Sequence, residues 1–86
     1  MVKVGVIGAG AMGTAVSQTI APNANVLLYA RRKEVSDDIN NTRVNSQYFP
    51  NVRLHDNITS IYDLNMLKEP CRNHLLKYLY GPVNVI

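Results

Sequence analysis

Residues 2–32 read VKVGVIGAGAMGTAVSQTIAPNANVLLYARR, and this stretch decides the fold. Residues 2–7 are rich in β-branched side chains, which is typical of a strand covered on both faces in a parallel sheet. A glycine-rich turn follows, and residues 14–21 predict a helix that ends before Pro22. Residues 25–30 predict a second buried strand, so the stretch forms a strand–helix–strand unit with a right-handed crossover.

The turn GAGAMG, residues 8–13, has the glycine spacing of a dinucleotide-binding fingerprint. Gly8 allows the tight turn out of the strand, Gly10 lets a pyrophosphate approach the backbone, and Gly13 lets the helix pack closely on the strand. The first N–H groups of the helix then face the phosphates, with the positive end of the helix dipole behind them. A turn that serves packing alone is the alternative, but the flanking strands and helix favour dinucleotide binding.

The end of the second strand predicts which dinucleotide is bound. An NAD site usually has Asp or Glu there, about 20 residues after the glycines, to hold the ribose 2′-hydroxyl. This sequence has Tyr29-Ala30-Arg31-Arg32 instead. Ala30 removes a carboxylate that would repel a 2′-phosphate, and the guanidinium forks of Arg31 and Arg32 match phosphate geometry. We expect NADP (NADPH) as cofactor, with NAD or dual use as the alternative; a solvated basic turn is the non-functional interpretation.

The rest of the chain continues the alternation of strands and helices. We expect the first helix to place Met12, Val16 and Ile20 on one side, and a second helix to face Val35 and Ile39 inward. The second helix is expected at residues 33–42, followed by an ordered loop at 45–57 and an edge strand at 57–60. We then expect a helix behind an acidic capping box at 60–63, a helix at 73–79 and a strand at 83–86. The fold class is therefore α/β, a Rossmann-type dinucleotide-binding fold with a short parallel sheet flanked by helices, incomplete at its C-terminal side.

The last strand is the one segment left to pair beside residues 3–7. An empty place there would leave unpaired backbone groups on a hydrophobic strand. We therefore expect residues 83–86 to pair with it in parallel, from the same chain or from a partner chain. The sheet order would be edge strand, second strand, first strand, last strand. Because four residues make a short strand, we also expect a weakly stable monomer that forms homo-oligomers through an exposed sheet edge.

Length and composition exclude several classes of protein. The 86 residues and 9.6 kDa allow one small domain, and 47% hydrophobic residues with a net charge of +3 argue against disorder. The sequence contains no run of about 18 apolar residues, so no membrane span is predicted. The one basic cluster, residues 31–33, has no interleaved aromatic residues, so nucleic acid is not an expected partner.

The single cysteine, Cys71, excludes an internal disulfide and suits a reducing cytoplasm. It stands in Cys-x-x-His spacing with His74. A metal site needs four ligands, however, so no metal is expected.

Residues 39–54, INNTRVNSQYFPNVRL, with Asn57-Ile58 and Asp63-Leu64 behind them, resemble NAD(P)-dependent glycerol-3-phosphate dehydrogenase. In that family a helix ending in Ile-Asn is followed by Asn-x-x-Tyr-Leu-Pro and a strand leading to Asp-Leu. The resemblance covers residues 1–64, because GAGAMGTA at the start is similar to the family's Gly-x-Gly-Ser-Trp-Gly-Thr-Ala. It implies the cofactor-binding domain of an enzyme that moves hydride between NAD(P)H and dihydroxyacetone phosphate or glycerol 3-phosphate.

The resemblance also implies roles for single residues. Ala11 and Met12 would line the cofactor phosphates, although the family has Ser and Trp there. Arg31 and Arg32 would take the adenosine end, and Tyr48 would lie near the bound nucleotide. With the three glycines, the expected cofactor-binding residues are Gly8, Gly10, Ala11, Met12, Gly13, Arg31, Arg32 and Tyr48.

The sequence departs from the family after Leu64. The family's apolar strand ending in Pro-Ser has no counterpart, and the sequence ends at Ile86, where the family has a Thr-Lys-Gly segment whose lysine contacts cofactor and substrate. The helical substrate domain with the catalytic lysine is absent as well. We expect residues 1–86 to be a single NAD(P)-binding domain fragment with no catalytic residue and no turnover of its own. The alternatives are a stand-alone NADP-binding module and the cofactor domain of a pyrroline-carboxylate reductase or 3-hydroxyacid dehydrogenase, which also favour Met before the third glycine.

Overall fold

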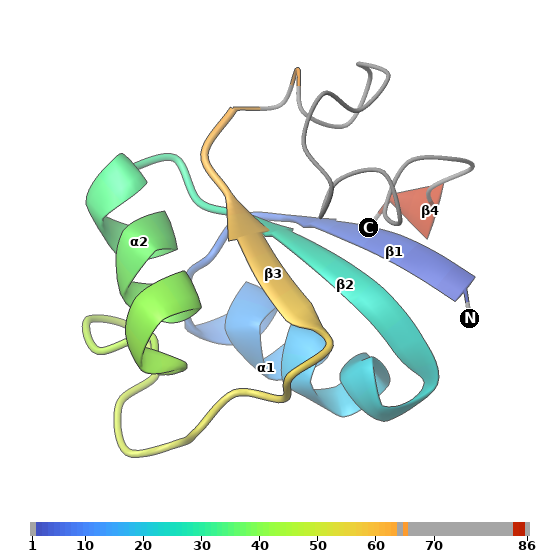
Figure 1. Cartoon of the computed structure of the whole chain (residues 1–86), viewed down its shortest axis with the longest axis horizontal. Helices are drawn as coiled ribbons and strands as arrows, with labels where there is room; N and C mark the ends of the chain where they lie inside the picture. The colour runs from blue at the N-terminus through green and yellow to red at the C-terminus, as the bar shows by residue number, and fades with distance from the viewer. Residues whose placement is uncertain (1, 64, 66–83, 86) are drawn as a thin grey trace.

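Strands and helices alternate along the chain, as the sequence predicts (Figure 1). The computed structural model describes residues 2–63, 65 and 84–85. In chain order its elements are β1 (Val2–Ile7), α1 (Ala11–Ile20), the 3₁₀ turn η1 (Ala21–Asn23), β2 (Ala24–Tyr29), α2 (Lys33–Thr42), β3 (Ile58–Ile61) and β4 (Asn84–Val85). The predicted helices behind residue 63 and at residues 73–79 lie outside the described residues.

The four strands form one parallel sheet in the order β3-β2-β1-β4. β1 pairs with β2 along its whole length, and β2 pairs with β3. On the other side of β1, Val4 is the partner of Asn84 and Gly5 is the partner of Val85. The predicted order and the parallel pairing of the last strand are therefore confirmed, and that strand comes from the same chain.

The core lies between the sheet and the two helices α1 and α2. Alternate residues of the three longer strands point into it and meet the apolar side of α2. Val35 and Ile39 of α2, which were expected to face inward, are 8% and 0% exposed. The strand residues of this core are Val4, Val6, Ala24, Val26, Leu28 and Ile58.

α1 differs from its prediction in its start and in its buried side. It begins at Ala11 instead of residue 14, and Met12, which was expected on the apolar side, is 81% exposed. The fully buried side chains of α1 are Thr14 and Ser17, whose hydroxyls donate to the carbonyl oxygens of Gly10 at 2.7 Å and of Gly13 at 2.8 Å. Small side chains with satisfied hydroxyls allow the helix to lie close to the sheet. Ile20 is partly buried and packs against the core as predicted, so the predicted side is wrong for Met12 but not for Ile20.

The predicted acidic capping box at residues 60–63 is wrong. Ser60 and Ile61 belong to β3, and the Ser60 hydroxyl donates to the carbonyl oxygen of Leu28 at 2.9 Å instead of capping a helix. Pairing with β2 satisfies the backbone of residues 58–61, which a local cap does not do.

The outer edge of β3 is closed by side chains of α2. The Asn40 amide donates to the carbonyl oxygen of Ser60 at 2.9 Å and accepts from the Ser60 N–H at 2.8 Å, as a neighbouring strand would. Arg43 donates to the carbonyl oxygen of Ile58 at 2.7 Å, and the Ile58 N–H donates to the carbonyl oxygen of His55 at 3.0 Å. Strand addition at this edge would have to break these bonds first.

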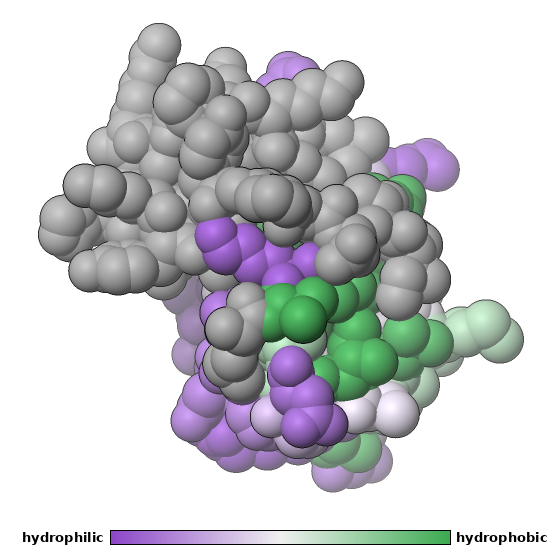
Figure 2. Space-filling view, turned by 90° about the vertical axis from the view of Figure 1, so that its right-hand side faces the viewer, coloured by the Kyte–Doolittle hydropathy of each residue, from purple (hydrophilic) through white to green (hydrophobic). Residues whose placement is uncertain are grey.

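One side of the molecule carries a hydrophobic area (Figure 2). Hydrophilic residues border this area. Two exposed hydrophobic side chains stand at the ends of β1, where Val2 is 55% and Ile7 is 45% exposed. Within the described ranges, no helix is long and apolar enough to cross a membrane.

Candidate functional site

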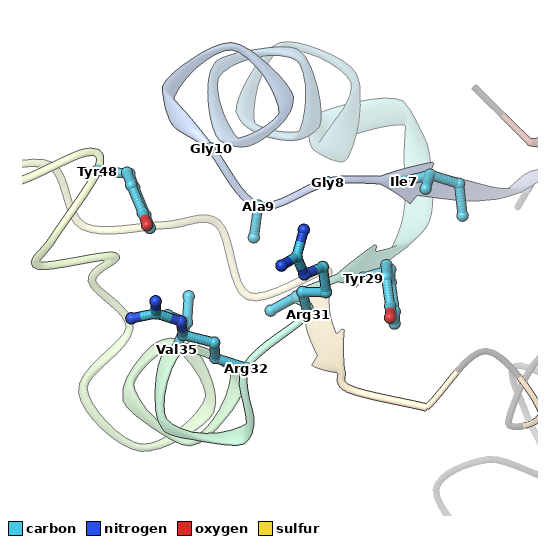
Figure 3. Close-up of a pocket in the computed structure, with 10 residues that line it drawn as sticks. Ile7, Gly8, Ala9, Gly10, Tyr29, Arg31, Arg32, Val35 and Tyr48 are labelled. Carbon is cyan, nitrogen blue, oxygen red and sulfur yellow. The ribbon is translucent and has the colours of Figure 1, made fainter.

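A cleft of about 470 Å³ opens where β1 and β2 end. One wall is the glycine turn between β1 and α1, and the other is the segment from Tyr29 to Arg32 that leads into α2. Val35 and Tyr48 complete the lining (Figure 3). The carboxyl ends of parallel strands are the place where open α/β sheets bind ligands. Of the predicted site residues, the fold therefore brings Gly8, Gly10, Arg31, Arg32 and Tyr48 to one cleft.

Gly8 and Gly10 expose backbone to the cleft, whereas Ala9 between them is buried. Gly8 has a φ of +113°, which residues other than glycine rarely adopt. Its N–H donates to the Tyr29 carbonyl oxygen at 3.1 Å. A Cβ on Gly10 would meet no atom within 4 Å. The glycine at position 10 is therefore not needed for packing, and its missing side chain leaves space in the cleft.

Gly13 has the opposite surroundings. A Cβ at this position would lie 1.8 Å from the carbonyl oxygen of Gly8. Only a glycine lets the first turn of α1 lie this close to the end of β1. The predicted packing role of Gly13 is confirmed.

The amino end of α1 is directed at the cleft through its backbone. Gly10 is the N-cap and has no side chain to satisfy the first N–H groups, which come from Ala11, Met12 and Gly13. Ala11 and Met12 are exposed in the first turn of the helix, beside the cleft and not on its wall. They offer N–H groups and the positive end of the helix dipole, and their predicted contact with phosphates stays a prediction.

Arg31 and Arg32 are exposed, and within the described residues their guanidinium groups form no hydrogen bond or ion pair with the protein. Arg31 extends from the end of β2 toward Ala9 and Gly8, whereas Arg32 lies on the side of Val35 and Tyr48 (Figure 3). Ala30, where an NAD site commonly has an acid, is 1% exposed. Both guanidinium groups are therefore available to a ligand.

Lys33, the third cation of the basic cluster, is paired instead. Its ammonium lies 2.8 Å from the Asp37 carboxylate, and this hydrogen bond raises the pKa of Lys33. No Asp or Glu of the described chain lines the cleft, and no group of three metal-ligating side chains is found in those ranges. The cleft is therefore a basic site without a built-in counterion, which favours an anionic ligand.

Tyr48 is 41% exposed and extends toward the cleft from the loop after α2 (Figure 3). Its loop is held to the glycine turn by Asn45, which is fully buried and donates from its side-chain amide to the carbonyl oxygen of Ala9 at 2.9 Å. The sequence analysis assigned no role to Asn45. The sequence does mark Asn45, because it is the first residue of the Asn-x-x-Tyr motif whose Tyr48 was singled out.

Residues 3–76 match the sequence model described as NAD-dependent glycerol-3-phosphate dehydrogenase N-terminus. The chain belongs to this family. A glycerol-3-phosphate dehydrogenase [NAD(P)+] of Methanothermobacter thermautotrophicus is 50% identical over 66 residues, which are 74% of this chain and 21% of the relative. The corresponding protein of an Exiguobacterium species is 38% identical over 87 aligned positions, covering all of this chain and 25% of the relative.

A solved structure agrees with this family. The glycerol-3-phosphate dehydrogenase of Plasmodium falciparum superposes with a TM-score of 0.66 at 27% identity, over 73% of this chain and 20% of that one. The chain thus spans about a fifth to a quarter of the length of the relatives it matches. The family and fold predicted from GAGAMG and from residues 39–54 are confirmed.

Proposed function

We propose that this chain binds a nicotinamide dinucleotide in the cleft between the glycine turn and Arg31-Arg32. The whole protein would then be a glycerol-3-phosphate dehydrogenase, which moves hydride between NAD(P)H and dihydroxyacetone phosphate or glycerol 3-phosphate. The observation that carries the proposal is the open position at Gly10, where no neighbouring atom explains the glycine and the amino end of α1 lies at the cleft. The names of the relatives, which specify NAD(P)+, support it.

Each wall of the cleft would bind a different part of the cofactor. The pyrophosphate would lie on the Gly8–Gly10 turn and accept hydrogen bonds from the first N–H groups of α1, next to Ala11 and Met12. The adenosine end would lie by Arg31 and Arg32, with Tyr48 at the side of the cleft. The bound cofactor supplies the hydride, and the residues of this chain bind and orient it.

NADPH is the proposed preferred cofactor. In the part of the chain that the structure describes, Arg31 and Arg32 have no carboxylate partner that would compete with a 2′-phosphate, and Ala30 puts no acid beside it. A guanidinium binds phosphate through two parallel hydrogen bonds, which an uncharged ribose hydroxyl cannot match. NAD remains the alternative cofactor of the same site.

The predicted self-association and cytoplasmic location are retained as proposals. Because Asn40 and Arg43 occupy the outer edge of β3, association of the unchanged chain through that edge should be weak, and Asn40→Ala should strengthen it. Light scattering after gel filtration of Asn40→Ala against the unchanged chain measures this. If Asn40→Ala and the unchanged chain have the same mass in solution, association through β3 is contradicted.

Isothermal titration calorimetry with NADPH and NADH tests the proposed function. We expect saturable binding of both and tighter binding of NADPH. Gly10→Val should abolish binding, because its side chain fills the place of the pyrophosphate. It should lower the melting temperature only slightly, because its Cβ meets no protein atom and only the helix N-cap is affected. Gly10→Ala is the graded control and should show an intermediate affinity. Binding that is absent in the parent chain, or unchanged in Gly10→Val, would contradict the proposal.

A further inference from the structure

The Asn45 side chain joins the two parts of the cleft that lie far apart in the sequence. It is fully buried, and its amide nitrogen donates to the carbonyl oxygen of Ala9 and to the hydroxyl oxygen of Thr14, both at 2.9 Å. Its amide oxygen accepts from the Tyr48 N–H at 3.4 Å. A carbonyl oxygen can only accept, so these partners fix which end of the amide is nitrogen.

Thr14 extends this network to Gly10. Its hydroxyl receives the hydrogen bond from Asn45 and donates its own proton to the carbonyl oxygen of Gly10 at 2.7 Å. The Thr14 N–H donates to the same oxygen at 3.0 Å. The carbonyl groups of two successive residues, Ala9 and Gly10, are therefore held toward the protein interior.

The direction of the Ala9 carbonyl fixes the direction of the Gly10 N–H. The described chain has no cis peptide bond, and in a planar trans peptide the carbonyl and the following N–H point in opposite directions. Because the Ala9 carbonyl points inward to Asn45, the Gly10 N–H points outward at the cleft wall. Within the described residues this N–H donates to no protein atom, so it is free for a ligand.

We propose that Asn45 is a positioning residue for cofactor binding, which rests on the proposed function. Its amide holds the Ala9–Gly10 peptide so that the Gly10 N–H faces the pyrophosphate of the dinucleotide. Through its bond to the Tyr48 N–H, the same amide also places the loop that carries Tyr48. Asn45 does not line the cleft and acts only through these groups.

The test separates positioning of the pyrophosphate from a general effect on the fold. Asn45→Ala and Thr14→Val each break the network, and Asn41→Ala, on the exposed surface of α2, is the matched control. Affinities are measured for NADPH and for adenosine 2′,5′-bisphosphate, which has the adenosine end and no pyrophosphate. We expect both network variants to lose about tenfold or more in NADPH affinity, with little change for the bisphosphate. Equal loss for both ligands, or loss for neither, would overturn the proposal.

A second readout needs no ligand. In the unchanged chain we expect the ¹⁵N order parameter of the Gly10 amide to be near that of a rigid backbone, about 0.85, and in Asn45→Ala to fall below about 0.6 while β1 and β2 stay rigid. Thr14→Ser keeps the hydroxyl that Thr14→Val removes, so its NADPH affinity and its Gly10 order parameter should equal those of the parent chain. A rigid Gly10 amide in Asn45→Ala would overturn the inference and leave the proposed function standing. A parent chain that binds no NADPH would overturn both.

Discussion

The glycine turn and the arginine pair lie on the two walls of one cleft, and they are fixed in different ways. At the turn, Gly8 is bonded to Tyr29, the carbonyl groups of Ala9 and Gly10 are held by Asn45 and Thr14, and Gly13 packs against Gly8. The two arginines are exposed, and their guanidinium groups form no hydrogen bond or ion pair with the described part of the protein.

From this difference we infer that the binding free energy is divided between the backbone of the turn and the side chains of the arginines. A turn that is already in place loses little entropy when a ligand binds, so it should supply the part of the affinity that every dinucleotide shares. Exposed arginines lose side-chain freedom on binding and should contribute through the extra phosphate of one cofactor. The predictions below test this division, beginning with the largest expected effect.

Substitutions at Gly13 and Gly10 should differ widely in how much they change the free energy of unfolding. Gly13→Ala puts a methyl group 1.8 Å from the Gly8 carbonyl oxygen and should lower the free energy of unfolding by about 3 kcal/mol, the upper range for overpacking. Gly10→Ala meets no atom and should change it by only about 0.5 kcal/mol. Urea denaturation of the two variants measures the difference. Similar losses for both would mean that the turn is not packed as described.

Removing the arginines should affect selectivity and leave the shared affinity in place. Arg31→Ala and Arg32→Ala should each lower NADPH affinity by about tenfold and leave NADH affinity nearly unchanged, because only the 2′-phosphate is lost as a partner. Arg53→Ala is the control, since Arg53 is also exposed but pairs with Asp56 outside the cleft. Parallel losses for NADPH and NADH in fluorescence titrations would refute the division between the two walls.

Salt should separate the two walls without any mutation. Exposed charges are screened at high ionic strength, where the Debye length falls from about 10 Å at 0.1 M to about 3 Å at 1 M. The preference for NADPH over NADH should therefore shrink as salt is added, while NADH binding at the turn changes less. A preference that does not change with salt would mean that the arginines do not carry it.

The sequence predicted the parts of this cleft that follow from local patterns. The β-branched strands, the glycine spacing and α2 from Lys33 to Thr42 agree with the structure. The buried side of α1 could not be predicted, because Thr14 and Ser17 satisfy their hydroxyls on the backbone of the preceding turn. The Asn-x-x-Tyr motif marks Asn45 as a residue of interest, but its contact with Ala9, 36 positions away in the chain, cannot be predicted from a local pattern.

The smallest expected effect concerns Asp38, which holds the loop between Asn45 and Tyr48. Its carboxylate accepts from the Ser46 N–H at 2.9 Å, and this bond lowers the pKa of Asp38 below the ordinary 3.8. A carboxyl group with a lowered pKa stabilises the folded chain above pH 3.8, and that stabilisation is lost as the pH falls through the lowered value. Asp38→Asn should therefore melt earlier than the parent at neutral pH and by a smaller margin in acid. An equal margin at both pH values would contradict this role.

The central claim is that one dinucleotide spans both walls of the cleft. Titration of the ¹⁵N-labelled chain with NADPH, followed by amide chemical shifts, tests it most directly. The account predicts that the amides of Gly8 and Gly10 on one wall and of Arg31 and Arg32 on the other shift together with a single dissociation constant. Shifts confined to one wall, or centred on residues outside the cleft, would contradict it.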